Sequence, residues 1–130
     1  MAIEFIRMKV WLADGTAVLL SGSAVLHPDG AIDLFGDAAE YGREILGALE
    51  RFDATAPLVE QRLHIDPLPR GSIRFDKVRI GTTDSLTPVS LMPGRPASIA
   101  PGAPDALKAA LDSKLASFRA VRATGRALAA

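Results

Sequence analysis

The sequence predicts an α+β fold built as a single domain. Three observations support this class: polar and apolar residues alternate near the N-terminus, two later segments carry apolar residues at helical spacing, and the composition suits one hydrophobic core. Of the 130 residues, 48% are hydrophobic and 23% are charged, as in a globular domain rather than a disordered chain. We expect an α+β core over residues 1–86, a proline-rich arm or loop over 87–104, and a C-terminal helix over 105–130.

The N-terminal segment predicts an antiparallel β-meander of about three strands. The alternating apolar residues of the first strand are Ile6, Met8, Val10 and Leu12. This is the period of a strand with one buried face. Asp14-Gly15 favours a two-residue hairpin turn, which would place Leu19 opposite Val10 on the apolar face.

The tripeptide His27-Pro28-Asp29 lies between the second and third predicted strands. It is the signature with which a J-domain engages its chaperone ATPase, and a J-domain holds it between two antiparallel helices. Here the flanking residues alternate with period two, and the glycine that follows can adopt the left-handed conformation of a turn. We therefore predict a β-hairpin that pairs Leu26 with Ile32.

An amphipathic helix is predicted over residues 38–52. Its apolar stripe consists of Tyr41, Ile45, Leu49 and Phe52. This spacing places all four on one face of a helix, and Asp37 is expected to cap the N-terminus. Gly42 and Gly47 interrupt the helix, so we expect them to allow close packing against the sheet.

One or two further strands are predicted between this helix and residue 81. Residues 58–66 alternate apolar with charged side chains, which favours a strand over a short helix. Residues 72–81 form a second candidate, in which the apolar phase slips near Asp76-Lys77 as it would at a β-bulge.

The segment 87–104 contains five of the nine prolines and has no sustained period. Such a stretch is typical of a functional loop, an arm or a linker. Its apolar side chains are Val89, Leu91, Met92 and Ile99. Because these are more apolar than a solvated linker requires, we expect a second polypeptide to cover them, with packing on the chain's own domain as the open alternative.

The C-terminal residues predict a helix with an apolar stripe and a basic stripe. The apolar stripe consists of Leu107, Leu111, Leu115, Phe118 and Val121, and the basic stripe consists of Lys108, Arg119, Arg122 and Arg126. The basic end complements an acidic segment, residues 29–66, in which nine acids stand against three arginines. This opposition of charge suits head-to-tail contact between copies of the chain.

Two histidine and aspartate pairs are the candidates for chemistry. His64 and Asp66 would face the same side of a strand and could serve one proton transfer as a catalytic pair. If His27 and Asp33 lie diagonally across their hairpin, the four side chains could form a metal site. These interpretations are alternatives. The favoured one is a turn and a polar strand face, with no catalytic residue, metal or cofactor.

Several residue types and motifs are absent from the sequence, and their absence excludes some function classes. The absence of cysteine excludes disulfides and thiolate sites, and neither of the two standard glycine-rich nucleotide loops occurs. The pI of about 6.7 and the 5% aromatic content argue against nucleic-acid binding. No apolar run approaches the ~20 residues that cross a membrane. The N-terminus lacks the features of a signal peptide, so we expect a cytoplasmic protein, or one exported only as part of a larger particle.

The sequence therefore favours a non-enzymatic structural or interaction subunit. We expect it to self-associate or to bind a partner protein in a multi-copy assembly, such as a phage particle or a secretion apparatus. One alternative is a small enzyme or ligand-binding protein with a pocket between the sheet and the C-terminal helix. Another is a nucleic-acid-binding accessory protein that uses the basic stripe.

Overall fold

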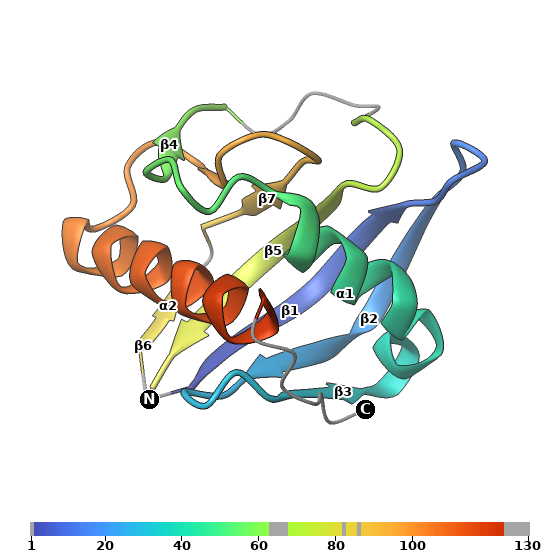
Figure 1. Ribbon diagram of the computed structural model, residues 1–130, viewed down its shortest axis with the longest axis horizontal. Coiled ribbons are helices and arrows are strands. Elements are labelled where there is room, and N and C mark those ends of the chain that lie inside the picture. The colour runs from blue at the N-terminus through green and yellow to red at the C-terminus, as the bar shows by residue number, and fades with distance from the viewer. Residues whose placement is uncertain (1, 63–67, 82, 86, 124–130) are drawn as a thin grey trace.

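The computed structural model describes residues 2–62, 68–81, 83–85 and 87–123, with backbone alone for 83–85 and 117–123. It confirms the α+β class. Within this part of the chain, an eight-stranded and mostly antiparallel sheet carries helices α1 and α2 on one face (Figure 1). The strand order is β3-β2-β1-β5-β7-β8-β4, and β6 pairs with β5 outside this path.

The predicted N-terminal meander is present as β1 (Ile3–Trp11), β2 (Ala17–Leu26) and β3 (Ile32–Phe35). Leu26 pairs with Ile32, as the sequence predicts. In the turn between these strands, the His27 amide donates to the Ala31 carbonyl at 2.9 Å, and Gly30 has a φ of 88°. The His-Pro-Asp tripeptide is therefore part of a β-hairpin.

The first hairpin differs from the predicted register by one residue. The Leu12 amide donates to the Thr16 carbonyl at 2.8 Å, and Gly15 has a φ of 90°, so the loop has three residues with a left-handed glycine at its end. Val10 consequently pairs with Val18, not with Leu19. Because a shift of one residue reverses the face of a side chain, Leu19 points away from the core and is 63% exposed.

The central strands β1 and β5 (Ile73–Ile80) both change phase at the same level of the sheet. The buried residues on either side of the change are Ile3, Phe5, Met8 and Val10 in β1, and Ile73, Phe75, Val78 and Ile80 in β5. Arg7, at the change in β1, has a φ of 57°. The change of apolar phase predicted at Asp76-Lys77 is therefore present. The pairing register between β1 and β5 stays constant because both strands change phase at the same level. The rings of Phe5 and Phe75 stack in the core with their centres 4.2 Å apart.

The predicted helix begins as a 3-10 helix, η1 (Gly36–Tyr41), and continues as α1 (Gly42–Arg51). Asp37 is not its N-cap, which corrects the prediction. Its carboxylate instead accepts hydrogen bonds from the Ser21 hydroxyl at 2.9 Å and from the Ser21 amide at 3.4 Å. The contact is close because Gly22 follows Ser21. A Cβ on Gly22 would overlap the Phe35 carbonyl oxygen and approach the Ala38 nitrogen at 2.8 Å.

The segment 87–104 is part of the core, which corrects the expectation that a second polypeptide covers it. It contributes β7 (Val89–Leu91), which pairs with β5, and β8 (Ser98–Ile99), which pairs with β7. The side chains of Val89, Leu91 and Ile99 are fully buried, and Met92 is 8% exposed. Short strands with a proline at their ends explain why no period is visible in the sequence.

Two short strands and the last helix complete the structure. The strands are β4 (Val59–Glu60), which runs parallel to β8, and β6 (Thr83–Ser85), which is antiparallel to β5. Residues 63–66 of the predicted strand 58–66 lie outside the described residues. Helix α2 (Asp105–Ala123) buries the predicted side chains Leu107, Leu111 and Leu115 in the core. Those of Phe118 and Val121 are among the side chains that are not described.

The contact at Gly22 yields a stability prediction. Gly22→Ala should lower the free energy of unfolding by more than about 3 kcal/mol, because the added methyl group meets backbone atoms that cannot rotate away. Urea unfolding measures the change. Gly94→Ala is the control, because its Cβ meets nothing within 4 Å and only its φ of 71° is unfavourable, at about 1 kcal/mol. Equal losses in the two variants would contradict the importance of the contact.

Candidate interaction surface

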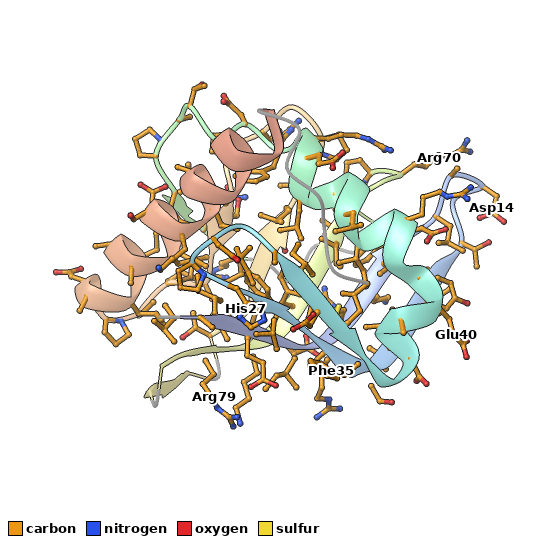
Figure 2. The ribbon with its side chains drawn as sticks, turned by 60° about the horizontal axis from the view of Figure 1, so that its bottom comes forward. Asp14, His27, Phe35, Glu40, Arg70 and Arg79 are labelled. Carbon is orange, nitrogen blue, oxygen red and sulfur yellow. The ribbon has the colours of Figure 1, made fainter. Side chains whose placement is uncertain are left out.

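The face of the sheet opposite α1 and α2 is not covered by either helix. We call it the open face. Strand alternation and register assign to it the side chains of Glu4, Ile6, Arg7, Lys9, Trp11, Leu19, Ser23, Val25, Asp33, Phe35, Arg74, Asp76, Lys77 and Arg79. Figure 2 brings the bottom of Figure 1 forward and labels two of these residues, Phe35 and Arg79.

Two large apolar side chains of the open face are exposed. Leu19 is 63% exposed and Phe35 is 52% exposed. They lie on neighbouring strands, separated by about 13 Å along β2. The half-buried Ile6 lies at the level of Phe35, and the exposed Arg7 lies between this level and that of Leu19. Trp11 lies beyond Leu19 and is buried, with the Lys9 ammonium 5.2 Å and the Arg74 guanidinium 5.6 Å from the centre of its ring.

The open face carries more basic than acidic residues. The basic residues are Arg7, Lys9, Arg74, Lys77 and Arg79, and the acidic residues are Glu4, Asp33 and Asp76, five against three. Some of these charges pair across strands, as Arg79 does with Glu4 at 3.0 Å. The segment formed by η1 and α1 has the opposite balance, with four acids (Asp37, Glu40, Glu44 and Glu50) against two arginines (Arg43 and Arg51).

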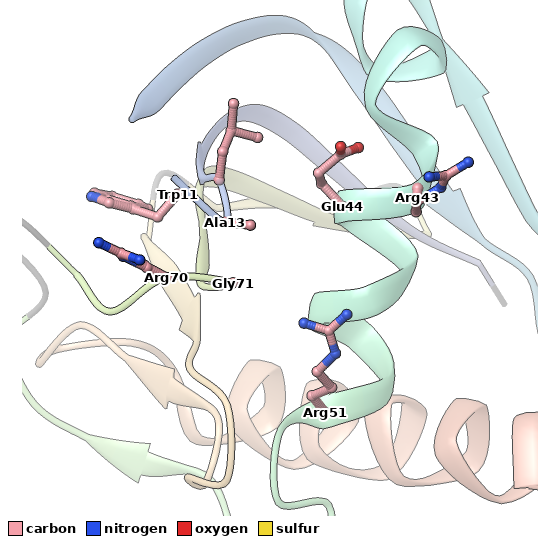
Figure 3. Close-up of a pocket in the computed structure, with 8 residues that line it drawn as sticks. Trp11, Ala13, Arg43, Glu44, Arg51, Arg70 and Gly71 are labelled. Carbon is pink, nitrogen blue, oxygen red and sulfur yellow. The ribbon is translucent and has the colours of Figure 1, made fainter. Parts of the chain in front are cut away.

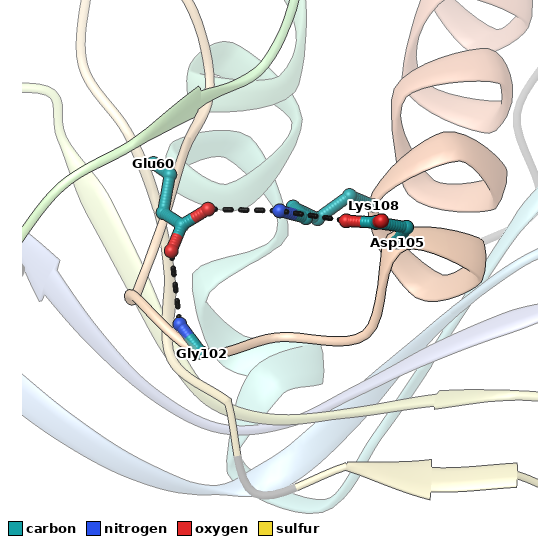
Figure 4. Close-up of polar contacts among 4 residues, drawn as sticks. All are labelled: Glu60, Gly102, Asp105 and Lys108. Carbon is teal, nitrogen blue, oxygen red and sulfur yellow. Dashed lines mark hydrogen bonds and ion pairs between the residues drawn. The ribbon is translucent and has the colours of Figure 1, made fainter.

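Lys108, a predicted contact residue, is engaged within the molecule. Its ammonium donates to Glu60 Oε2 at 2.8 Å and lies 3.1 Å from Asp105 Oδ1, while the Gly102 amide donates to Glu60 Oε1 at 2.9 Å (Figure 4). These contacts attach the N-terminal turn of α2 to β4. Lys108 lowers the pKa of the Glu60 carboxyl by this hydrogen bond, and Glu60 in turn raises the pKa of Lys108.

The other predicted residues of the basic stripe cannot be placed relative to this contact. Arg119 and Arg122 belong to α2 by their backbone, but their side chains are not described, and Arg126 lies outside the described residues. The interaction role of the basic stripe therefore stays a prediction.

His27 and Asp33 meet across the hairpin of β2 and β3, where His27 Nε2 lies 2.8 Å from Asp33 Oδ2. His64 and Asp66, the other half of the hypothetical metal site and the candidate catalytic pair, lie outside the described residues. The described part of the chain contains no group of three or more side chains that could hold a metal ion. The His27 and Asp33 pair by itself fixes the end of the hairpin.

The alternative of a small enzyme or ligand-binding protein predicts a pocket between the sheet and the C-terminal helix. A shallow cavity of about 310 Å³ lies in this region, between α2 and the segment that leads into β4. Its charged groups already have partners. Glu60 and Lys108 bond to each other, and the Asp112 carboxylate accepts the Leu58 amide at 3.1 Å. These polar groups serve the attachment of α2.

The exposure of Leu19 and Phe35 was not predicted, although the sequence contains a signal for it. Each is adjacent to a second apolar residue, in Leu19-Leu20 and in Leu34-Phe35. Neighbours on a strand face opposite sides of the sheet, so only one of each pair can enter the core. Leu20 and Leu34 occupy the inner positions.

Comparison of the chain with protein-family models, curated proteins and solved structures finds no match. Over the described residues, none of the helices has both the length and the apolar character needed to span a membrane. The case for a function therefore depends on the surfaces of the molecule.

The contact of Glu60 with Lys108 predicts a pH-dependent stability difference. Lys108→Gln should lower the urea midpoint at neutral pH, and the difference from the original protein should disappear in acid. A carboxyl with a lowered folded-state pKa stabilises above its unfolded pKa, and this contribution is lost as the pH falls through the folded pKa. Urea unfolding at pH 7 and about pH 3 measures both differences, and a constant difference would contradict this role of the pair.

Proposed function

We propose that the chain is a non-enzymatic interaction subunit that self-associates through the open face of its sheet. The observation that carries the proposal is the exposure of Leu19 and Phe35 on a sheet face that neither helix covers. Apolar side chains among arginines are typical of contacts between folded proteins. Such a surface forms an interface without refolding of the subunit.

The charges favour a head-to-tail contact between copies. Two open faces packed against each other would bring two surplus positive charges on each side together, which opposes association. The segment of η1 and α1 has an excess of two acids, and Asp37 and Glu40 are exposed on it. The open face of one copy therefore complements the η1 and α1 surface of the next. A contact of this kind produces a ring or a filament, according to whether the rotation closes.

Truncation of the two apolar side chains should abolish self-association. We expect multi-angle light scattering to show oligomers of the original protein at tens of micromolar, and monomers after Leu19→Ser combined with Phe35→Ser. Thermal stability should change little, because both side chains are exposed. Val59→Ser is the matched control, since Val59 is 40% exposed but belongs to the opposite edge strand β4. An original protein that is monomeric at these concentrations would refute the proposal.

Charge reversal distinguishes head-to-tail from face-to-face contact. Arg7→Glu and Glu40→Lys should each weaken association, and the double variant should recover part of it, because the opposite changes restore complementary surfaces. Sedimentation velocity over a range of protein concentrations gives the association constants. If Glu40→Lys has no effect while Arg7→Glu does, the contact excludes the η1 surface and the head-to-tail arrangement is wrong.

A further inference from the structure

Arg7 has a backbone conformation that suits glycine better than arginine. Its φ is 57°, in the left-handed region, where a Cβ crowds the following carbonyl oxygen. Seven other described residues have a positive φ, and all seven are glycines. Within the described part of the chain, residue 7 is therefore the one position where a side chain is kept in spite of this strain.

The pairing of β1 with β2 accounts for the backbone at this position. The register of the two strands shifts between Ile6 and Met8. Arg7 alone therefore lies opposite two residues of β2, Ser21 and Gly22. Such a two-to-one mismatch is a β-bulge, which commonly contains a left-handed residue, and that residue is usually a glycine. The fold thus explains the φ of residue 7 and leaves its arginine side chain unexplained.

The Arg7 guanidinium is not used by the described part of the molecule. The side chain is exposed at the middle of β1, and among the described residues it forms neither a hydrogen bond nor an ion pair. In this it differs from the rest of the open face. The other basic residues of this face all have interactions within the molecule, namely Lys9, Arg74, Lys77 and Arg79.

We propose that Arg7 is the hot spot of the contact between copies and that it binds the carboxylate of Glu40 in the neighbouring copy. The contact is that of the proposed function, on which this inference rests. Arginine is enriched among the few residues that supply most of the binding energy of an interface. Its guanidinium forms two parallel hydrogen bonds with a carboxylate, which adds affinity and fixes the orientation of the two copies.

Glu40 is the acid of the η1 and α1 segment best placed for this contact. It is exposed on the outer side of η1 (Figure 2), and no hydrogen bond or ion pair with another described residue engages it. Asp37 is already held by Ser21. Glu44 is half-buried and borders a cavity of about 330 Å³ between α1 and the end of β1 (Figure 3). Glu50 interacts within the molecule.

Two substitutions at residue 7 separate the side chain from the backbone strain. Arg7→Ala removes the guanidinium and keeps a Cβ in the left-handed conformation, whereas Arg7→Gly removes both. Each should weaken association at least about tenfold in sedimentation velocity, because each removes a charge-assisted contact. Arg7→Gly should nevertheless have a higher urea midpoint than Arg7→Ala, because glycine relieves the strain.

Two further variants provide the control and identify the partner group. Arg70→Ala is the matched control, since Arg70 is an exposed arginine that lies beside Gly15 of the first hairpin and not on the open face, and its association should be unchanged. Glu40→Gln should weaken association about as much as Arg7→Ala. Because the two groups bind each other, the double variant should associate no more weakly than either single variant.

The outcomes are distinct. Weakened association in both Arg7 variants, with the higher midpoint in Arg7→Gly, supports the inference. Undiminished association of Arg7→Ala overturns it, as does an equal loss in Arg70→Ala or a lower midpoint in Arg7→Gly than in Arg7→Ala. Losses that add in the double variant overturn Glu40 as the partner group. An original protein that does not associate refutes the proposed function itself, whereas one that associates equally well without Arg7 refutes this inference alone.

Discussion

The close contact between Gly22 and the turn at residues 35–38 determines how this chain folds. The backbone after β3 passes directly over Gly22, where no side chain intervenes, and Ser21 fixes it through the Asp37 carboxylate. This crossing takes η1 and α1 onto the face of the sheet that already holds Phe5, Met8 and Leu20. Helix α2 packs on the same face, so the whole apolar core lies on one side of the sheet (Figure 1). The open face follows from this one-sided arrangement.

The burial of residues 87–104 changes which part of the surface is available for contacts. Val89, Leu91 and Ile99 extend the sheet beyond β5 and close the core, so they require no second polypeptide. Lys108 is likewise occupied by Glu60. These two features, which suggested subunit contacts in the sequence, therefore serve the fold. The proposal of self-association now depends on Leu19, Phe35 and the charges around them.

Local features of the fold were predictable and contacts distant in sequence were not. The second hairpin, the helix over residues 38–52 and the buried stripe of α2 follow from periodicity and turn chemistry, which are properties of neighbouring residues. The three-residue loop after Leu12 was missed because Asp14-Gly15 fits both turn lengths. Asp37 was assigned to a helix cap because its partner, Ser21, is sixteen residues away. The cavity between α1 and the end of β1 could not be predicted for the same reason, since its walls combine β1, α1 and the turn before β5.

The central claim is that the open face becomes buried when copies of the chain associate. Hydroxyl-radical footprinting at low and high protein concentration tests it most directly, because it reports the exposure of individual side chains. The account predicts that Phe35 and Leu19 become protected as concentration rises, while Val59 on the far edge strand keeps its reactivity. Unchanged reactivity of Phe35 in a sample that has associated would contradict it and would place the interface on another surface.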